Sequence, residues 1–113
     1  MKTIVLTALL LLLALSVSSA DTPVTMTGMV VDLHCYVSRG AHGPEHAGCS
    51  NACISRGVPA GFLADDGTLY LLLDARPFSV NEKVAGKAGQ KVTVKGKVVE
   101  KSGMKALQLE SVE

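Results

Sequence analysis

The chain has 113 residues, which allows one small domain with a modest hydrophobic core. Its 11 basic residues nearly balance its 10 acidic ones. This balance excludes a strong overall attraction to nucleic acid or anionic lipid, so we expect no nucleic-acid partner.

The first twenty residues have the pattern of a secretory signal peptide. Lys2 precedes an apolar run over residues 4–15, and small residues close the segment at Ala20. The run is short for a membrane span, which needs about 20 apolar residues. We therefore expect a signal peptide over 1–20, export to the periplasm or extracellular space, and no membrane span after cleavage. The mature chain, residues 21–113, is then a single domain.

A first strand is expected over residues 24–33, where Val and Thr are dense. Gly28 within it indicates a bulge or a close backbone approach. The turn formers that follow predict a loop over residues 36–45.

A helix is expected next, from Pro44 to Arg56. Proline suits the first helical position because it lacks the N–H that would be unpaired there. Gly57 is placed for a left-handed cap at the end of this helix.

Two hairpins make up most of the remaining chain. The first spans residues 60–74 and turns at Asp66-Gly67, and its continuous leucines indicate a central strand. A linking segment with one or two helical turns follows over residues 77–89. The second hairpin spans residues 90–112, with a bend expected at Gly96. Its turn is predicted at Ser102-Gly103.

This order of elements suits a mainly β protein, a five-stranded OB-like barrel. The Cys/His-bearing helix is then inserted between strands 1 and 2, within the first loop of the OB plan. Ligands commonly bind to OB folds at this loop.

All three cysteines and all three histidines of the chain lie between His34 and Cys53. At about 100° per residue, His46, Cys49 and Cys53 fall on one helical face. The loop after Cys35 is long enough to fold back onto that face. Thiolate and imidazole ligands suit Zn²⁺ or Cu⁺. The leading hypothesis is a non-enzymatic Cys₃His metal site with Cys35, His46, Cys49 and Cys53.

Neighbouring residues are secondary candidates for the same site. His34 or His42 can replace His46 as a ligand, and Asp32 can orient an imidazole or cap the backbone. The chain has no Cys-x-x-Cys-His motif, so covalent c-type haem is not expected.

Two other interpretations of the cysteines remain open. Exported domains favour disulfides, and Cys35–Cys49 or Cys35–Cys53 would staple the domain and leave one free thiol. The protein would then be an interaction module for an unknown protein partner. A third interpretation is redox chemistry of a free thiol beside a disulfide. A Cys49–Cys53 bond is disfavoured on an intact helix.

Other patterns carry less information. No catalytic motif stands out, which argues against an enzyme. A basic ribbon in the second hairpin is explained by a solvated sheet face. It consists of Lys91, Lys95, Lys97, Lys101 and Lys105.

The segments "GMVVDLHCY" and "HAGCSNACISRGVPAGFL" resemble a motif of small, uncharacterised exported bacterial proteins. That motif reads Gly-x-Val-x-Asp-x-x-Cys, then His-x-x-Cys-x-x-x-Cys-(Ile/Val)-x-x-Gly-x-Pro. The last two strands also resemble the C-terminal part of small exported OB-fold proteins. The resemblance implies no activity, but it singles out His46 over the other histidines. The matching positions are Gly28, Asp32, Cys35, His46, Cys49, Cys53, Gly57 and Pro59.

Overall fold

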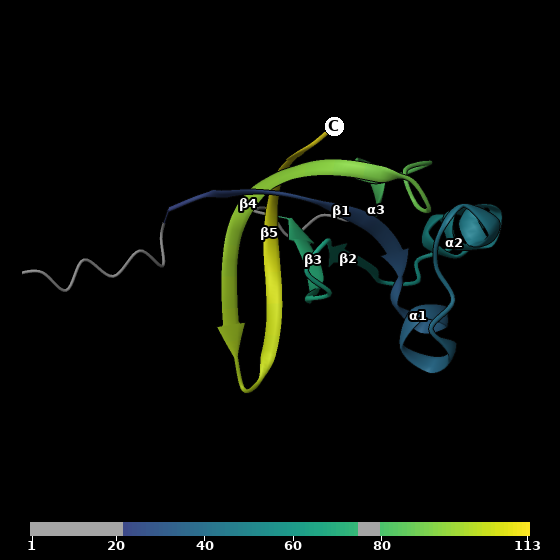
Figure 1. The fold of residues 1–113 in the computed structure, drawn as a ribbon, viewed down its shortest axis with the longest axis horizontal. Coiled ribbons are helices and arrows are strands. Elements are labelled where there is room, and N and C mark those ends of the chain that lie inside the picture. Colours follow the sequence, from purple (N-terminus) through teal and green to yellow (C-terminus); the bar gives the residue numbers. More distant parts are fainter. Residues whose placement is uncertain (1–21, 75–79) are drawn as a thin grey trace, which may run out of the picture.

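The computed structural model describes residues 22–74 and 80–113, and its five strands close into a barrel (Figure 1). The prediction of a mainly β, OB-like barrel with a Cys/His-bearing helix between strands 1 and 2 is confirmed. The elements in chain order are β1 (Val24–Asp32), α1 (Leu33–Arg39), a 3₁₀ turn (Pro44–His46), α2 (Ala47–Ser55), β2 (Ala60–Ala64), β3 (Leu69–Asp74), α3 (Val80–Lys83), β4 (Lys91–Lys101) and β5 (Met104–Val112).

Two predicted features fall outside the described residues. These are the signal peptide, residues 1–20, and residues 77–79 of the linking segment. Among the residues that are described, no helix has the length and apolar character needed to cross a membrane.

Strand β1 closes the barrel because it pairs antiparallel with two neighbours. Its first part pairs with β4, and its second part, from Gly28 to Asp32, pairs with β2. The pairs β2–β3 and β4–β5 are also antiparallel, whereas β3–β5 is parallel. The strand order is therefore β1-β2-β3-β5-β4, the closed five-stranded arrangement expected of an OB-like barrel.

Strand β4 alternates valines inside the barrel with lysines outside it. Val92 and Val94 are buried, and Lys91 and Lys95 are exposed. The register with β5 shifts between Lys95 and Gly96, within the short stretch of β4 that pairs with both β1 and β5. The predicted bend at Gly96 is therefore confirmed.

Both predicted hairpin turns are present. The N–H of Thr68 donates to Oδ1 of Asp66 at 2.9 Å in the first turn, and Gly67 has a φ of 87°. Ser102 and Gly103 form the second turn with φ of 52° and 81°. Positive φ at both central residues is the two-residue geometry that suits twisted strands. Strand β3 pairs on both edges, as its continuous leucines predicted.

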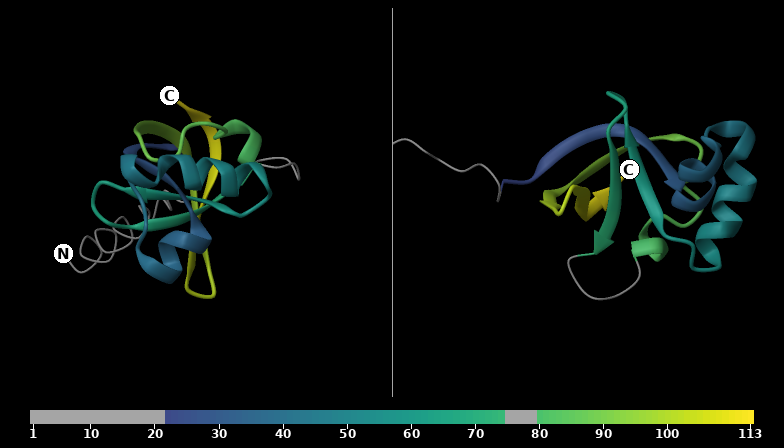
Figure 2. Two further views of the ribbon diagram at one scale, coloured as in Figure 1. Left: turned by 90° about the vertical axis from the view of Figure 1, so that its right-hand side faces the viewer. Right: turned by 90° about the horizontal axis from the view of Figure 1, so that it is seen from below.

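Helices α1 and α2 lie together at one end of the barrel, beside the point where β1 ends (Figure 1). Viewed from that end, both helices lie in front of the strands (Figure 2, left). Together they form the insertion between β1 and β2.

Helix α2 is held on the barrel by its core residue and by side-chain amides. Ile54 is only 2% exposed and belongs to the hydrophobic core. Asn51 donates to the carbonyl of Ala88 at 3.3 Å and accepts from its N–H at 3.0 Å. Asn81 of α3 donates to the carbonyls of Ile54 and Val58. The position of α2 is thus set by the barrel.

The prediction of a loop over residues 36–45 is wrong for residues 36–39, because these belong to α1, which continues to Arg39. The side chain of Asp32 accepts a hydrogen bond from the N–H of Cys35 and so caps the first turn. Gly40 ends the helix in the left-handed conformation, with a φ of 69°. Seven residues between two strong caps are enough for a short helix.

The helix predicted from Pro44 to Arg56 is present, but it begins differently. Residues Pro44–His46 form a 3₁₀ turn, and the α-helix proper covers Ala47–Ser55. Gly57 has a φ of 99°, so the predicted left-handed residue after the helix is confirmed.

Gly28 provides a test of how closely β1 packs on β2. A Cβ at Gly28 would collide with the carbonyl oxygen of Leu63 and lie 2.7 Å from the ring of Phe62. We expect Gly28→Ala to lower the free energy of unfolding by about 2 kcal/mol, the usual cost of overpacking. Urea denaturation measures this loss.

Gly48 is the matched control, because it lies in α2 and a Cβ there would meet nothing within 4 Å. Gly48→Ala is expected to stabilise the protein by about 0.5 kcal/mol, the usual gain in a helix. An unchanged stability for Gly28→Ala would contradict the close approach.

Candidate metal centre

The three cysteine thiols converge where α1 and α2 meet. Cys35 of α1 is buried, whereas Cys49 and Cys53 lie one turn apart on α2, the first exposed and the second half-buried. Their Sγ atoms all lie within 4.8 Å of one another. All three thiols are free, so neither predicted disulfide, Cys35–Cys49 or Cys35–Cys53, is formed.

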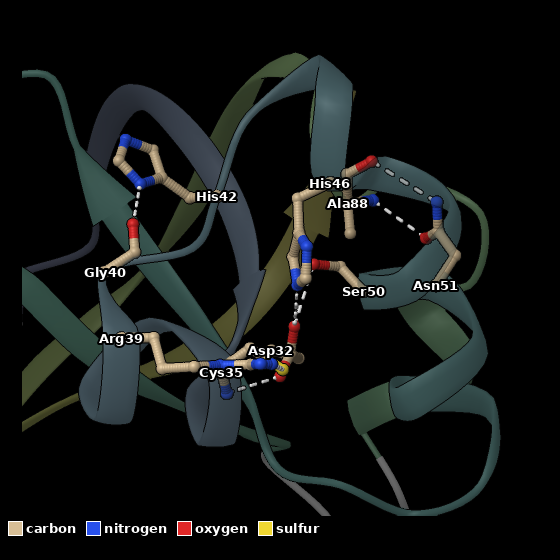
Figure 3. A network of polar contacts seen from close by, with 9 residues as sticks. All are labelled: Asp32, Cys35, Arg39, Gly40, His42, His46, Ser50, Asn51 and Ala88. Carbon is tan, nitrogen blue, oxygen red and sulfur yellow. Dashed lines mark hydrogen bonds and ion pairs between the residues drawn. The ribbon is translucent and has the colours of Figure 1, made fainter.

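The carboxylate of Asp32 joins the two helices through Cys35 of α1 and Ser50 of α2 (Figure 3). It is fully buried at the end of β1. Oδ1 accepts from the N–H of Cys35 at 2.8 Å, and Oδ2 accepts from the hydroxyl of Ser50 on α2 at 2.8 Å. Nε2 of His46 lies 3.5 Å from the same Oδ2. Asp32 therefore caps α1 and anchors α2 with one side chain.

These contacts determine the charge of Asp32. Burial alone raises the pKa of its carboxyl, but hydrogen bonds from Cys35 and Ser50 and the nearby His46 together outweigh burial. The net result is a pKa below the ordinary value, so Asp32 carries a negative charge at neutral pH.

His46 belongs to a second group of candidate ligands. Ligand atoms of Asp32, Cys35 and His46 all lie within 4.8 Å of one another, so Cys35 belongs to both groups. A continuous helix was predicted to place His46 beside the thiols of α2. In the structure His46 lies at the junction between the 3₁₀ turn and α2, and it groups with Asp32 and Cys35 rather than with Cys49 and Cys53. The tighter winding of a 3₁₀ turn changes the direction of its side chain.

The other two histidines belong to neither group. His34 and His42 are both exposed. Nδ1 of His42 lies 2.7 Å from the carbonyl oxygen of Gly40, and its ring packs edge-on against Tyr36 with centroids 5.4 Å apart. His42 therefore has a local partner of its own in the connection between the helices.

Arg39 is a further residue of the site, and it was not among the predicted ligands. Its Nη2 donates a hydrogen bond to Sγ of Cys35 at 3.0 Å, and this bond raises the pKa of the guanidinium. The signal that identifies Arg39 is its spacing, four residues after Cys35, which places both on one face of a helix. The spacing identifies Arg39 only if residues 33–39 are known to form a helix.

Ser50 was likewise missed, because its partner Asp32 is 18 residues away in the chain. It is 2% exposed and lies on the face of α2 that meets β1. A buried serine hydroxyl requires a hydrogen-bond acceptor. Asp32 supplies that acceptor.

Cys53 has an altered proton affinity. Burial raises the pKa of its thiol, and a hydrogen bond with Cys49 together with nearby negative charge raises it further. A metal ion binds the thiolate, so binding at Cys53 displaces a proton and weakens as the pH falls.

The fold and the site together define an OB-like barrel with a Cys₃ group and an overlapping Asp/Cys/His group, both positioned to hold a metal ion. No protein-family model, curated protein or solved structure matches the chain. The donor atoms suit a borderline or soft transition metal, because thiolate and imidazole are its preferred ligands.

Asp32→Asn tests the role of the buried carboxylate in metal-free protein. At neutral pH we expect a loss of about 2 kcal/mol in the free energy of unfolding, because the amide cannot accept both hydrogen bonds. The folded-state pKa of Asp32 lies below its ordinary value of 3.8. Its charged form therefore stabilises the fold above that value, and this contribution is lost as the pH falls through the folded-state pKa.

Urea denaturation at several pH values, with chelator present, measures the difference between Asp32→Asn and the unaltered protein. The difference should narrow in acid. Asp66→Asn is the control, because Asp66 is an exposed turn residue and its loss should cost less. A difference that is independent of pH would show that the charge of Asp32 is not what stabilises the site.

Proposed function

We propose that this protein is an exported, non-enzymatic domain that binds a transition-metal ion, Zn²⁺ or Cu⁺, through Cys35, Cys49 and Cys53. His46 supplies a nitrogen ligand for the fourth position. The cluster lies in the connection between β1 and β2, where OB-like barrels commonly bind ligands.

The convergence of three thiols from two helices carries this proposal. Zinc with Zn–S bonds of about 2.3 Å separates its sulfurs by about 3.8 Å. The three Sγ atoms already lie within 4.8 Å of one another. Small adjustments of the three cysteine side chains therefore bring their sulfurs to this separation, and no rearrangement of the helices is required.

Charge also supports a divalent ion. Three thiolates carry three negative charges, and Zn²⁺ compensates two of them. The guanidinium of Arg39, 3.0 Å from Sγ of Cys35, lies beside the remaining charge. A positive side chain at this distance stabilises an anionic metal–thiolate centre, as charged neighbours do in other metal sites.

Metal analysis and thiol titration of the protein, purified without chelator, test the proposal. We expect one or more bound metal ions per chain and three thiols that become reactive when a chelator removes the metal. One reactive thiol with no stoichiometric metal would instead indicate a disulfide and an interaction module. Cys49→Ser and Cys53→Ser should each weaken binding, because each removes one thiolate ligand.

Arg39→Met tests the charge compensation without removing a ligand. We expect about a 10-fold loss of metal affinity, as is typical when a residue that contacts a metal ligand is replaced. Competition with a chromogenic chelator measures the affinity. Arg56→Met is the matched control, because Arg56 is an exposed cation just after α2 and should have no effect. Equal losses in both variants would point to overall charge rather than to the contact with Cys35.

A further inference from the structure

We propose that the site holds two divalent metal ions that share the thiolate of Cys35. The first ion is that of the Cys₃ group, so the inference rests on the proposed function. The second ion is bound by Asp32, His46 and Cys35. With the second ion present, His46 is a ligand of that ion rather than of the first.

The overlap of the two ligand groups is the basis for this inference. Cys35 belongs to both, and within each group all ligand atoms lie within 4.8 Å of one another. A soft thiolate sulfur can bridge two metal ions. Cys35 is suited to this role because its Sγ lies within 4.8 Å of the thiols of α2 and also of ligand atoms of Asp32 and His46.

His46 provides an independent observation. Its Nε2 atom is buried and has no hydrogen-bond partner among the described residues. The nearest carboxylate oxygen, Oδ2 of Asp32, lies at 3.5 Å, beyond a good hydrogen bond. A buried nitrogen is rarely left unpaired, and a metal ion is one of the partners that satisfies it. This nitrogen is one of the ligand atoms of the second group, so a metal ion bound there would be its missing partner.

Asp32 has the capacity to bind an ion without giving up its structural contacts. A carboxylate has about four lone pairs on its two oxygens. The N–H of Cys35 and the hydroxyl of Ser50 each use one of these. The remaining lone pairs are available to a cation.

The charges of the complete ligand set allow a second ion. Three thiolates and the carboxylate of Asp32 carry four negative charges, and a neutral imidazole adds none. One divalent ion leaves two charges, of which Arg39 can offset one. Asp32 and Cys35 are at most 3% exposed, and uncompensated charge is costly at such buried positions. Two divalent ions neutralise the four ligand charges, and the one positive charge that then remains is that of Arg39, an exposed side chain.

Titration of the purified, reduced protein with Co²⁺ tests this inference, because Co²⁺ replaces Zn²⁺ and is visible by absorption and EPR. Two ions per chain are expected. The EPR signal per ion should fall as the second site fills, because a shared thiolate couples the two spins. One ion per chain would overturn the inference and leave the proposed function intact. No binding would overturn both.

His46→Ala separates the two sites. This variant should bind one Co²⁺ with thiolate-to-metal absorption retained, because the Cys₃ group is unaltered. His42→Ala is the matched control and should still bind two, since His42 is an exposed histidine that belongs to neither group. Circular dichroism confirms that each variant is folded. Two coupled ions in His46→Ala would overturn the inference, as would loss of both ions from folded His46→Ala.

Discussion

The buried carboxylate of Asp32 is the contact on which the arrangement of the site depends. It ends β1, caps α1 through the N–H of Cys35 and accepts a hydrogen bond from Ser50 of α2. Each of these bonds involves an ionised acceptor, and such bonds are about twice as strong as neutral ones. If the carboxylate were removed, the start of α1 and the direct contact between β1 and α2 would be less well defined, and the thiols on the two helices would be held less closely together.

The barrel supports the Asp32 contact because it positions both helices independently of any ligand. Cys35 follows the end of β1 by only three residues, so its position is tied to the sheet. Helix α2 is fixed by Ile54 in the core and by the paired hydrogen bonds between Asn51 and Ala88. The thiols are therefore brought together by folding, and a bound metal need not supply the free energy that orders them. Such preorganisation increases affinity.

Features set by local sequence were predictable, whereas those set by packing were not. The hairpin turns and the alternation of Val and Lys in β4 depend on neighbouring residues, and the structure contains them. Helix α1 was not predicted because its seven residues run directly into the turn formers within residues 40–44, and its main signal is a single capping aspartate. The grouping of His46 with Asp32 depends on a 3₁₀ turn that a uniform helical period does not describe. The bond from Ser50 to Asp32 exists only once α2 lies on β1.

The geometry also explains why a metal and a disulfide compete as interpretations of the same three cysteines. A disulfide brings one pair of sulfurs to about 2.05 Å and leaves the third thiol unused. A metal ion would use all three at a separation of about 3.8 Å, close to the separation of at most 4.8 Å that the thiols already have. In an oxidising compartment, a bound metal would also keep the thiols from reacting, because it would occupy the thiolates that attack a disulfide. A metal therefore accounts for the third cysteine and for His46, whereas a disulfide accounts for neither.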